Sequence, residues 1–340
     1  MLVSAILVVG HDSPTHSQEL DSPETGTLAG APLACLEVLG ASVVERTAQT
    51  LRHAGVPVVT VVMADEFSHH LGTMDGAEIR PVPAPTDLWS AAECVLREHI
   101  HHGVGSILLA RLGCYAEFDL PDLIRFHRDS KAGITTLDKD GGTLEAWLIE
   151  AREVHNMSRI GLPRLLASEK EVRVANYPLQ GYVSKLETAA DLRRLAKDSL
   201  DGRSSITPRG QQVQSGIWLD EDVQIRRNAR VVAPAYVGRG VILRGGALVA
   251  GSSVVERGCD IGEATMIIDA SILAETRVGR GLNVAHAVVD GGHLVPLKHH
   301  VTLDIHDARL LGRTVNKGTR QAGGTVDTSL AERLLATAWN

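Results

Sequence analysis

The fold is decided by the stretch from Val213 to Leu273, which reads VQSGIWLDEDVQIRRNARVVAPAYVGRGVILRGGALVAGSSVVERGCDIGEATMIIDASIL. Every sixth position in it is aliphatic, and the series is Val213, Leu219, Ile225, Val231, Val237, Leu243, Val249, Val255, Ile261, Ile267 and Leu273. Four positions after most of these stands a small or slender residue, such as Ala229 or Ala247. Neither a helix nor a plain strand has this period. It predicts a parallel β-helix of hexapeptide repeats, with the aliphatic side chains pointing into a narrow interior.

Composition bounds the class of protein. A chain of 340 residues favours two domains. The net charge of -7 argues against general nucleic-acid binding. The apolar residues 1–9 are too short for a membrane span and lack a basic flank, so we expect neither an anchor nor a signal peptide. The four cysteines have no ligand spacing and indicate reduced thiols, which predicts a cytoplasmic protein.

The first 200 residues alternate between strand and helix signals. Short apolar runs at residues 3–9, 56–63, 107–110 and 134–137 predict strands. Helices are expected after Ser42, from about Asp87, after Asp119 and from Thr188. Repeated strand–helix units predict a Rossmann-like, mostly parallel and doubly wound sheet. Such sheets bind ligands at the carboxyl ends of their strands.

We therefore expect an α/β domain over residues 1–200, a linker over 201–214, the β-helix over 215–311, and a loose segment with a last helix over 312–340. Ser329 and Glu332 form a capping box for that helix, which carries Leu330, Leu334 and Leu335. This apolar face either packs on the chain's own β-helix or serves as an assembly contact. Because a β-helix has open ends and long flat faces, we expect a homo-oligomer.

Three segments carry a resemblance to a known family. They are residues 36–51 (LEVLGASVVERTAQTL), 118–130 (FDLPDLIRFHRDS) and 181–192 (GYVSKLETAADL). With the order of parts, they resemble the sugar-1-phosphate nucleotidyltransferases that carry a C-terminal left-handed β-helix, such as mannose-1-phosphate guanylyltransferases and glucose-1-phosphate adenylyltransferases. The resemblance implies a nucleotidyltransferase fold in the first domain and a left-handed hand for the β-helix.

The catalytic motifs of that family are degenerate here. The first loop has Gly10 and His11 but no nearby arginine, the lysine position falls on Ala31, and the base-binding turn ends in Trp89. The two metal-binding aspartates align with Gly113 and Lys185. Magnesium needs oxygen ligands, which neither residue supplies. The motifs therefore predict a catalytically silent relative with no catalytic residue, metal or cofactor, and Mg²⁺ enters only if the enzyme is active after all.

Three basic residues are candidates for anion binding. Lys185 could replace the charge of the missing metal and hold a phosphate, or it could point to solvent or to a nearby acid. Arg226 and Arg244 lie 18 residues apart, one full coil, so they should stack about 4.8 Å apart. Like charges so placed require an anion or an acid between them, unless the side chains splay into water.

Three functional classes remain open. The first is a non-catalytic nucleotidyltransferase-like protein with a regulatory, scaffolding or ligand-sensing role in nucleotide-sugar or surface-polysaccharide metabolism. Its partner would be a catalytic paralogue, or a nucleotide or sugar phosphate, with no nucleic acid and no membrane. The second is an active sugar-1-phosphate nucleotidyltransferase with an atypical site. The third is a β-helix acyltransferase that uses a histidine such as His286 or His293 as general base.

Overall fold

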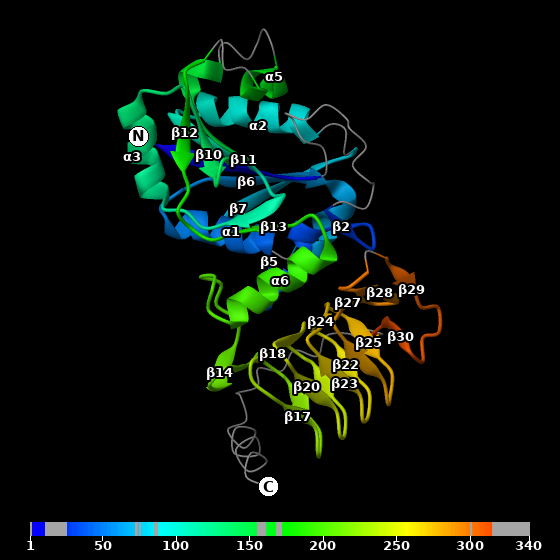
Figure 1. Ribbon diagram of the computed structural model, residues 1–340. Helices are drawn as coiled ribbons and strands as arrows, with labels where there is room; N and C mark the ends of the chain where they lie inside the picture. Colours follow the sequence, from blue (N-terminus) through cyan, green and yellow to red (C-terminus); the bar gives the residue numbers. More distant parts are fainter. Residues whose placement is uncertain are drawn as a thin grey trace. The chain divides into compact units, whose positions relative to one another are not determined.

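The computed structural model describes residues 2–10, 26–71, 74, 76–84, 88–154, 161–167, 172–299 and 301–314 (Figure 1). The chain forms two compact units, the first from residues 1–36 and 42–188, the second from 37–41 and 189–340. Helix α6 (Ala189–Leu200) thus groups with the second unit, whereas the sequence placed it at the end of the first domain. It does so because its Arg193 side chain bonds to Asp269. The helix predicted at Ser329 lies outside the described residues.

The first unit contains a seven-stranded sheet in the order β12-β10-β11-β8-β1-β6-β7. The strands are β1 (Val3–Val9), β6 (Val59–Ala64), β7 (Ala77–Val82), β8 (Ser106–Arg111), β10 (Ile134–Lys139), β11 (Gly142–Glu150) and β12 (Val174–Pro178). Only β11 runs antiparallel to its two neighbours within this sheet, and the other pairs are parallel. The sheet is therefore mixed and mostly parallel.

Three helices of this unit lie where the sequence predicts them: α1 (Val43–His53), α2 (Leu88–His101) and α3 (Leu120–Ser130). A short fourth helix, α5 (Leu162–Ala167), was not predicted. Ser42 begins α1 as expected, and the structure adds a capping box, since Ser42 Oγ accepts from Glu45 N and Glu45 Oε2 accepts from Ser42 N. Asp119 caps α3 by accepting from Asp122 N at 3.0 Å. None of the described helices has the length and apolar character that crossing a membrane requires.

Buried polar residues in this unit are paired. His99 lies on the buried face of α2, and both of its ring nitrogens form hydrogen bonds. Nδ1 is 2.8 Å from Ser4 Oγ, and Nε2 is 3.1 Å from Thr60 Oγ1. Burial lowers the pKa of His99, so its neutral form is favoured in the folded chain. Its neighbours His101 and His102 are exposed. The three histidines therefore do not converge on one centre.

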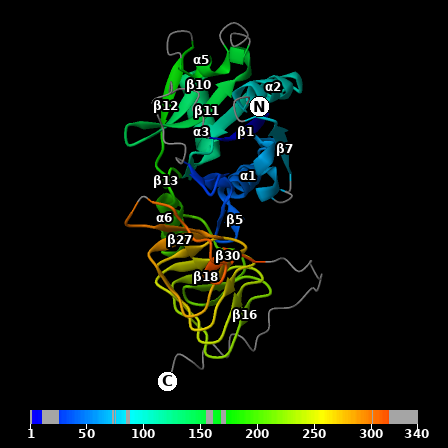
Figure 2. The ribbon, with the colours of Figure 1, turned by 90° about the vertical axis from the view of Figure 1, so that its right-hand side faces the viewer.

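Short strands of the second unit stack in three parallel sheets. The first contains β15 (Ile217–Leu219), β18 (Ala235–Val237), β21 (Ser253–Val255), β24 (Ser271–Ile272) and β27 (Ala287–Asp290). The second contains β16 (Gln224–Ile225), β19 (Ile242–Leu243), β22 (Asp260–Ile261) and β25 (Thr276–Val278). The third contains β17 (Arg230–Val231), β20 (Leu248–Ala250), β23 (Met266–Ile268) and β26 (Asn283–Ala285). Figure 2 shows these coils from the side, and their arrangement is compatible with a parallel β-helix.

Antiparallel strands flank the stack at both ends. β14 (Gln211–Gln214) pairs with β15 at the start. At the far end, β28 (His293–Pro296) pairs with β27, β29 (Leu303–Asp304) with β28, and β30 (Leu311–Arg313) with β25. Parallel stacking in this sheet thus stops at Asp290, and the later strands pair antiparallel up to Arg313.

The interior of the stack holds the predicted aliphatic series with one change. The members from Val231 to Ile267 are buried, and Val213 and Ile225 are partly buried against them. Val255 pairs with Ile272, 17 residues on, whereas Val237 pairs with Val255, 18 residues on. The corner after β23 is therefore one residue shorter than the corner after β20. As a result Ile272 joins the interior cluster in place of the predicted Leu273.

Residues 37–41 belong to the second unit because a buried carboxylate holds them. Glu256 is fully buried, and its two oxygens accept hydrogen bonds from Leu39 N at 2.6 Å and Gly40 N at 2.9 Å. Next to it, Arg257 Nε donates to Glu37 Oε1 at 2.5 Å. A Cβ atom at Gly40 would lie 2.3 Å from Tyr236 Oη, so the close approach requires glycine.

Burying a charge in the interior should unfold the second unit. We expect Val249→Asp or Ile261→Asp to cost more than about 4 kcal/mol, because both side chains are fully buried among aliphatic neighbours. Val232→Asp is the control, since Val232 is 47% exposed and the change should cost about 0.5 kcal/mol or less. Thermal unfolding followed by circular dichroism measures both. A parent-like melting temperature for Ile261→Asp would show that its side chain does not point inward.

Candidate functional site

The order of strands marks one edge of the first unit's sheet as a binding edge. From β1 the chain proceeds to β6 and β7 on one side, and then returns to β8 on the other side of β1. Open α/β sheets bind ligands outside the carboxyl ends of the strands at such a reversal. The candidate site therefore lies at the ends of β1 and β8, at Gly10 and residues 111–113.

The structure brings together the two positions that the resemblance aligns with metal-binding aspartates. β9 (Cys114–Ala116) pairs with β13 (Val183–Lys185), which places Lys185 opposite Cys114. The backbone N–H of Leu186 donates to the carbonyl of Gly113 at 2.9 Å. Lys185 itself points outward, with its side chain 69% exposed and its Nζ 3.2 Å from Glu187 Oε1. Lys185 thus lies beside an acid, and phosphate binding by Lys185 stays a prediction.

An arginine that the sequence did not single out spans this edge. Arg111, the last residue of β8, forms an ion pair with Glu145 of β11, and its Nη1 donates to the Gly10 carbonyl at 3.3 Å. A Cβ atom at Gly113 would lie only 3.0 Å from Arg111 Nη2. The guanidinium group thus occupies the space beside Gly113, where the family has a carboxylate.

Bulky side chains fill the region that the resemblance assigns to the base. A Cβ atom at Gly10 would meet Leu88 Cδ1 at 2.3 Å, and Leu88 is buried. Trp89 lies edge-on to Trp147 with ring centroids 6.4 Å apart and packs against the core. Trp89 is therefore a packing residue.

Of the remaining positions of the degenerate pocket, the one that the structure describes adds no charge to it. Ala31, at the family's lysine position, is buried in the hairpin of β2 (Thr27–Leu28) and β3 (Ala31–Pro32). His11 lies outside the described residues. Burial raises the pKa of the Cys114 thiol to about 11, which keeps this neighbour of Gly113 protonated at neutral pH.

The residues at this edge do not fit a magnesium ion. Mg²⁺ takes oxygen ligands in octahedral geometry. Gly113 and Lys185 supply none, and the guanidinium of Arg111 would repel the cation. Within the part of the chain that the structure describes, no group of three His, Cys, Asp or Glu residues is placed to hold a metal.

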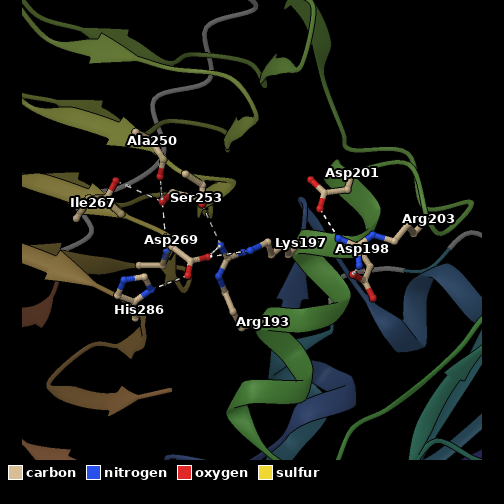
Figure 3. Close-up of polar contacts among 12 residues, drawn as sticks. Arg193, Lys197, Asp198, Asp201, Arg203, Ala250, Ser253, Ile267, Asp269 and His286 are labelled. Carbon is tan, nitrogen blue, oxygen red and sulfur yellow. Dashed lines mark hydrogen bonds and ion pairs between the residues drawn. The ribbon is translucent and has the colours of Figure 1, made fainter. Parts of the chain in front are cut away.

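A second polar cluster surrounds Asp269 in the second unit (Figure 3). Asp269 Oδ1 accepts from Arg193 Nη2 at 2.8 Å, and Oδ2 lies 2.7 Å from His286 Nδ1. Lys197 Nζ is 3.6 Å from Asp269 Oδ1. The Arg193 side chain is 3% exposed, while that of His286 is 54% exposed. A histidine held through Nδ1 by a carboxylate presents Nε2 as a base or hydrogen-bond acceptor.

The electrostatics of this cluster favour an ionised Asp269. Burial alone would raise its pKa, but the hydrogen bond to His286 and the charges of Arg193 and Lys197 outweigh burial and lower the pKa. The sequence singled out His286, while Asp269 and Arg193 escaped notice because they lie 76 residues apart in the chain.

The stacked arginines of the second unit have partners within the protein. Arg226 and Arg244 follow the paired strands β16 and β19. Arg244 binds both carboxylate oxygens of Asp260, each at 2.7 Å, and Arg226 Nη2 donates to Gln224 Oε1 at 2.9 Å. The acid that the stack requires thus comes from the next coil. His293 Nδ1 similarly lies 2.6 Å from Asp304 Oδ1.

No protein-family model matches the chain, and no curated protein sequence is significantly similar to it. The class of the molecule is therefore set by its own architecture: an N-terminal α/β sheet followed by a strand-rich region with parallel strands. Its function has to be inferred from the residues at the two sites.

Removing the charge of Asp269 should weaken the second unit in a pH-dependent way. At neutral pH we expect Asp269→Asn to cost about 1–3 kcal/mol, because it leaves the buried Arg193 without its carboxylate. Since folding lowers the pKa of Asp269, its contribution is present above the unfolded value of about 3.9 and is lost as the pH falls through the lower folded value.

Denaturant unfolding at neutral and acidic pH measures this contribution. Asp222→Asn is the control, because Asp222 is exposed and lies between β15 and β16, in the first coil of the same stack. The parent should lose more stability on acidification than the Asp269→Asn variant does. Parallel pH curves for the two proteins would show that Asp269 is not held ionised by its partners.

Proposed function

We propose that the chain is a non-catalytic nucleotidyltransferase-like protein with a left-handed β-helix, which senses a ligand or regulates a partner in nucleotide-sugar or surface-polysaccharide metabolism. The observation that carries the proposal is the Arg111–Glu145 ion pair beside Gly113. The strand reversal at β1 and the contact between residues 113 and 186 support the relation to the family.

The side chains at this edge suit the binding of a phosphate better than the transfer of a nucleotidyl group. Nucleotidyl transfer depends on Mg²⁺ and cationic side chains that neutralise charge developing on the transferred phosphate. Here a guanidinium stands in place of a metal-binding carboxylate, and it is already paired with Glu145. A phosphate oxygen could exchange with Glu145 on Arg111, because guanidinium groups bind phosphate and carboxylate with the same geometry. Such an exchange would bind a phosphate ligand without cleaving it.

The proposed lack of nucleotidyltransferase activity has a direct test. We expect no measurable pyrophosphate release from nucleoside triphosphates with hexose 1-phosphates and Mg²⁺. Gly113→Asp should not restore it, because the new carboxylate would meet the Arg111 guanidinium, and Lys185 would remain in place of the second aspartate. A turnover of about 1 per second or more, on protein free of contaminating enzyme, would contradict the proposal.

A second candidate function rests on the His286–Asp269 pair. The geometry suits a general base for acyl transfer, since Asp269 holds Nδ1 and the ring is half exposed. The assay is thiol release from acyl-coenzyme A with amino-sugar acceptors. A rate that falls about 100-fold or more in His286→Asn would favour this candidate over the first, and no release by the parent would eliminate it.

A further inference from the structure

Among the residues that the structure describes, none covers part of the interior at the far end of the strand stack. A cavity of about 250 Å³ opens there, lined mainly by apolar residues that include Val284, Ala287, Leu294, Pro296, Ile305 and Leu311. Val284, Ala287 and Leu311 also belong to the interior cluster of the stack. In the preceding coils the next coil covers such positions. The last coil of a repeat protein needs a cap instead.

Two exposed apolar residues adjoin this cavity, and a third, Val301, stands two residues before one of them in the chain. Val301, Leu303 and Leu310 are 54%, 42% and 43% exposed. Leu310 lines the cavity, and Leu303 is paired with Leu294 across β28 and β29. Single exposed apolar residues are ordinary, but a group that adjoins an apolar cavity indicates a binding surface. We call this cavity and its three exposed residues the end patch.

We propose that the chain's own C-terminal segment, residues 329–340 (SLAERLLATAWN), docks on the end patch and caps the stack. The described chain ends at Thr314, three residues after Leu311 of the cavity lining. Thr314 is fixed there, because its N–H donates to the Glu275 carbonyl and its Oγ1 to Glu275 Oε2, both at 2.8 Å.

The length of the connecting chain and the spacing of the leucines both suit the C-terminal segment as the occupant of the end patch. The 14 residues 315–328 can span up to about 50 Å, so the segment can return to the end patch. Leu330, Leu334 and Leu335 have the spacing of one apolar helix face. The cavity is smaller than the roughly 300–1,000 Å³ of most small-molecule sites, and it suits a few aliphatic side chains.

Tethering favours the same chain over a second copy. A segment joined to its site by a short stretch of chain meets that site at an effective concentration on the order of millimolar. A second copy of the chain at micromolar concentration cannot compete with the tethered segment, unless the connecting residues are too few to reach the end patch. The inference does not depend on the proposed function, since it concerns how the strand stack ends.

Hydrogen exchange of the full chain, followed by mass spectrometry, tests the docking. We expect amides in residues 330–338 to exchange at least about tenfold more slowly than an unstructured peptide. Leu334→Asp and Leu310→Asp should each remove that protection. Their matched controls are Arg333→Asp, on the polar side of the segment, and Val58→Asp, at a 40% exposed residue of the first unit. Circular dichroism confirms that Leu310→Asp, a surface change, keeps its fold.

The dependence of this protection on protein concentration distinguishes the chain's own segment from a second copy of the chain. Protection that is constant over a roughly fifty-fold range of protein concentration supports docking within one chain. Protection that grows with concentration, together with a doubled mass in light scattering, would show a second copy on the end patch and overturn the proposal. Unprotected amides at every concentration, or protection that survives Leu310→Asp, would also overturn it.

Discussion

The second unit depends on one constraint: every coil must place an aliphatic side chain over the one in the coil before it. Val237, Val255, Ile272 and Val289 occupy successive positions of one such column. The strands between corners are two to four residues long, so they gain little stability alone. Burial of the columns and hydrogen bonds between coils hold them together. This stack holds helix α6 and residues 37–41, and the end patch lies at its last coil.

Several buried or half-buried charged groups of the described residues are paired with a distant part of the chain, although Nε and Nη1 of Arg193 have no hydrogen-bond partner. Glu256 receives two backbone N–H groups, and Asp269 shares its oxygens between Arg193 and His286. Arg111 and Glu145 satisfy each other at the sheet edge. Removing one member of such a pair is costly, because the other stays buried without compensation. At the sheet edge, the two opposite charges of Arg111 and Glu145 therefore balance each other.

Much of the architecture could be predicted from local patterns. The six-residue period predicted which side chains point inward, and Ser42 and Asp119 were recognised as helix caps because capping depends on residues three positions apart. The antiparallel β11 was not foreseen, because strand direction depends on partners distant in the chain. Leu273 was misassigned because a corner one residue shorter shifts the register, and a neighbouring isoleucine satisfies the same pattern.

The candidate sites were predictable only in part. Gly113 and Lys185 were located by resemblance, and the structure brings them together. The Arg111–Glu145 and Arg193–Asp269 pairs join residues 34 and 76 positions apart, and such separations leave no local signal in one sequence. The sequence therefore indicated what the sheet edge lacks, while the structure identified the group that stands there.

Calorimetric titration of the full chain with nucleoside triphosphates, nucleotide sugars and hexose 1-phosphates, with Mg²⁺ and with a chelator in its place, tests the central claim most directly. The claim predicts that at least one of these phosphate ligands binds, that its affinity is the same within about twofold in both conditions, and that it is recovered unchanged. Binding that requires Mg²⁺, conversion of the ligand, or no binding by any of them would contradict it.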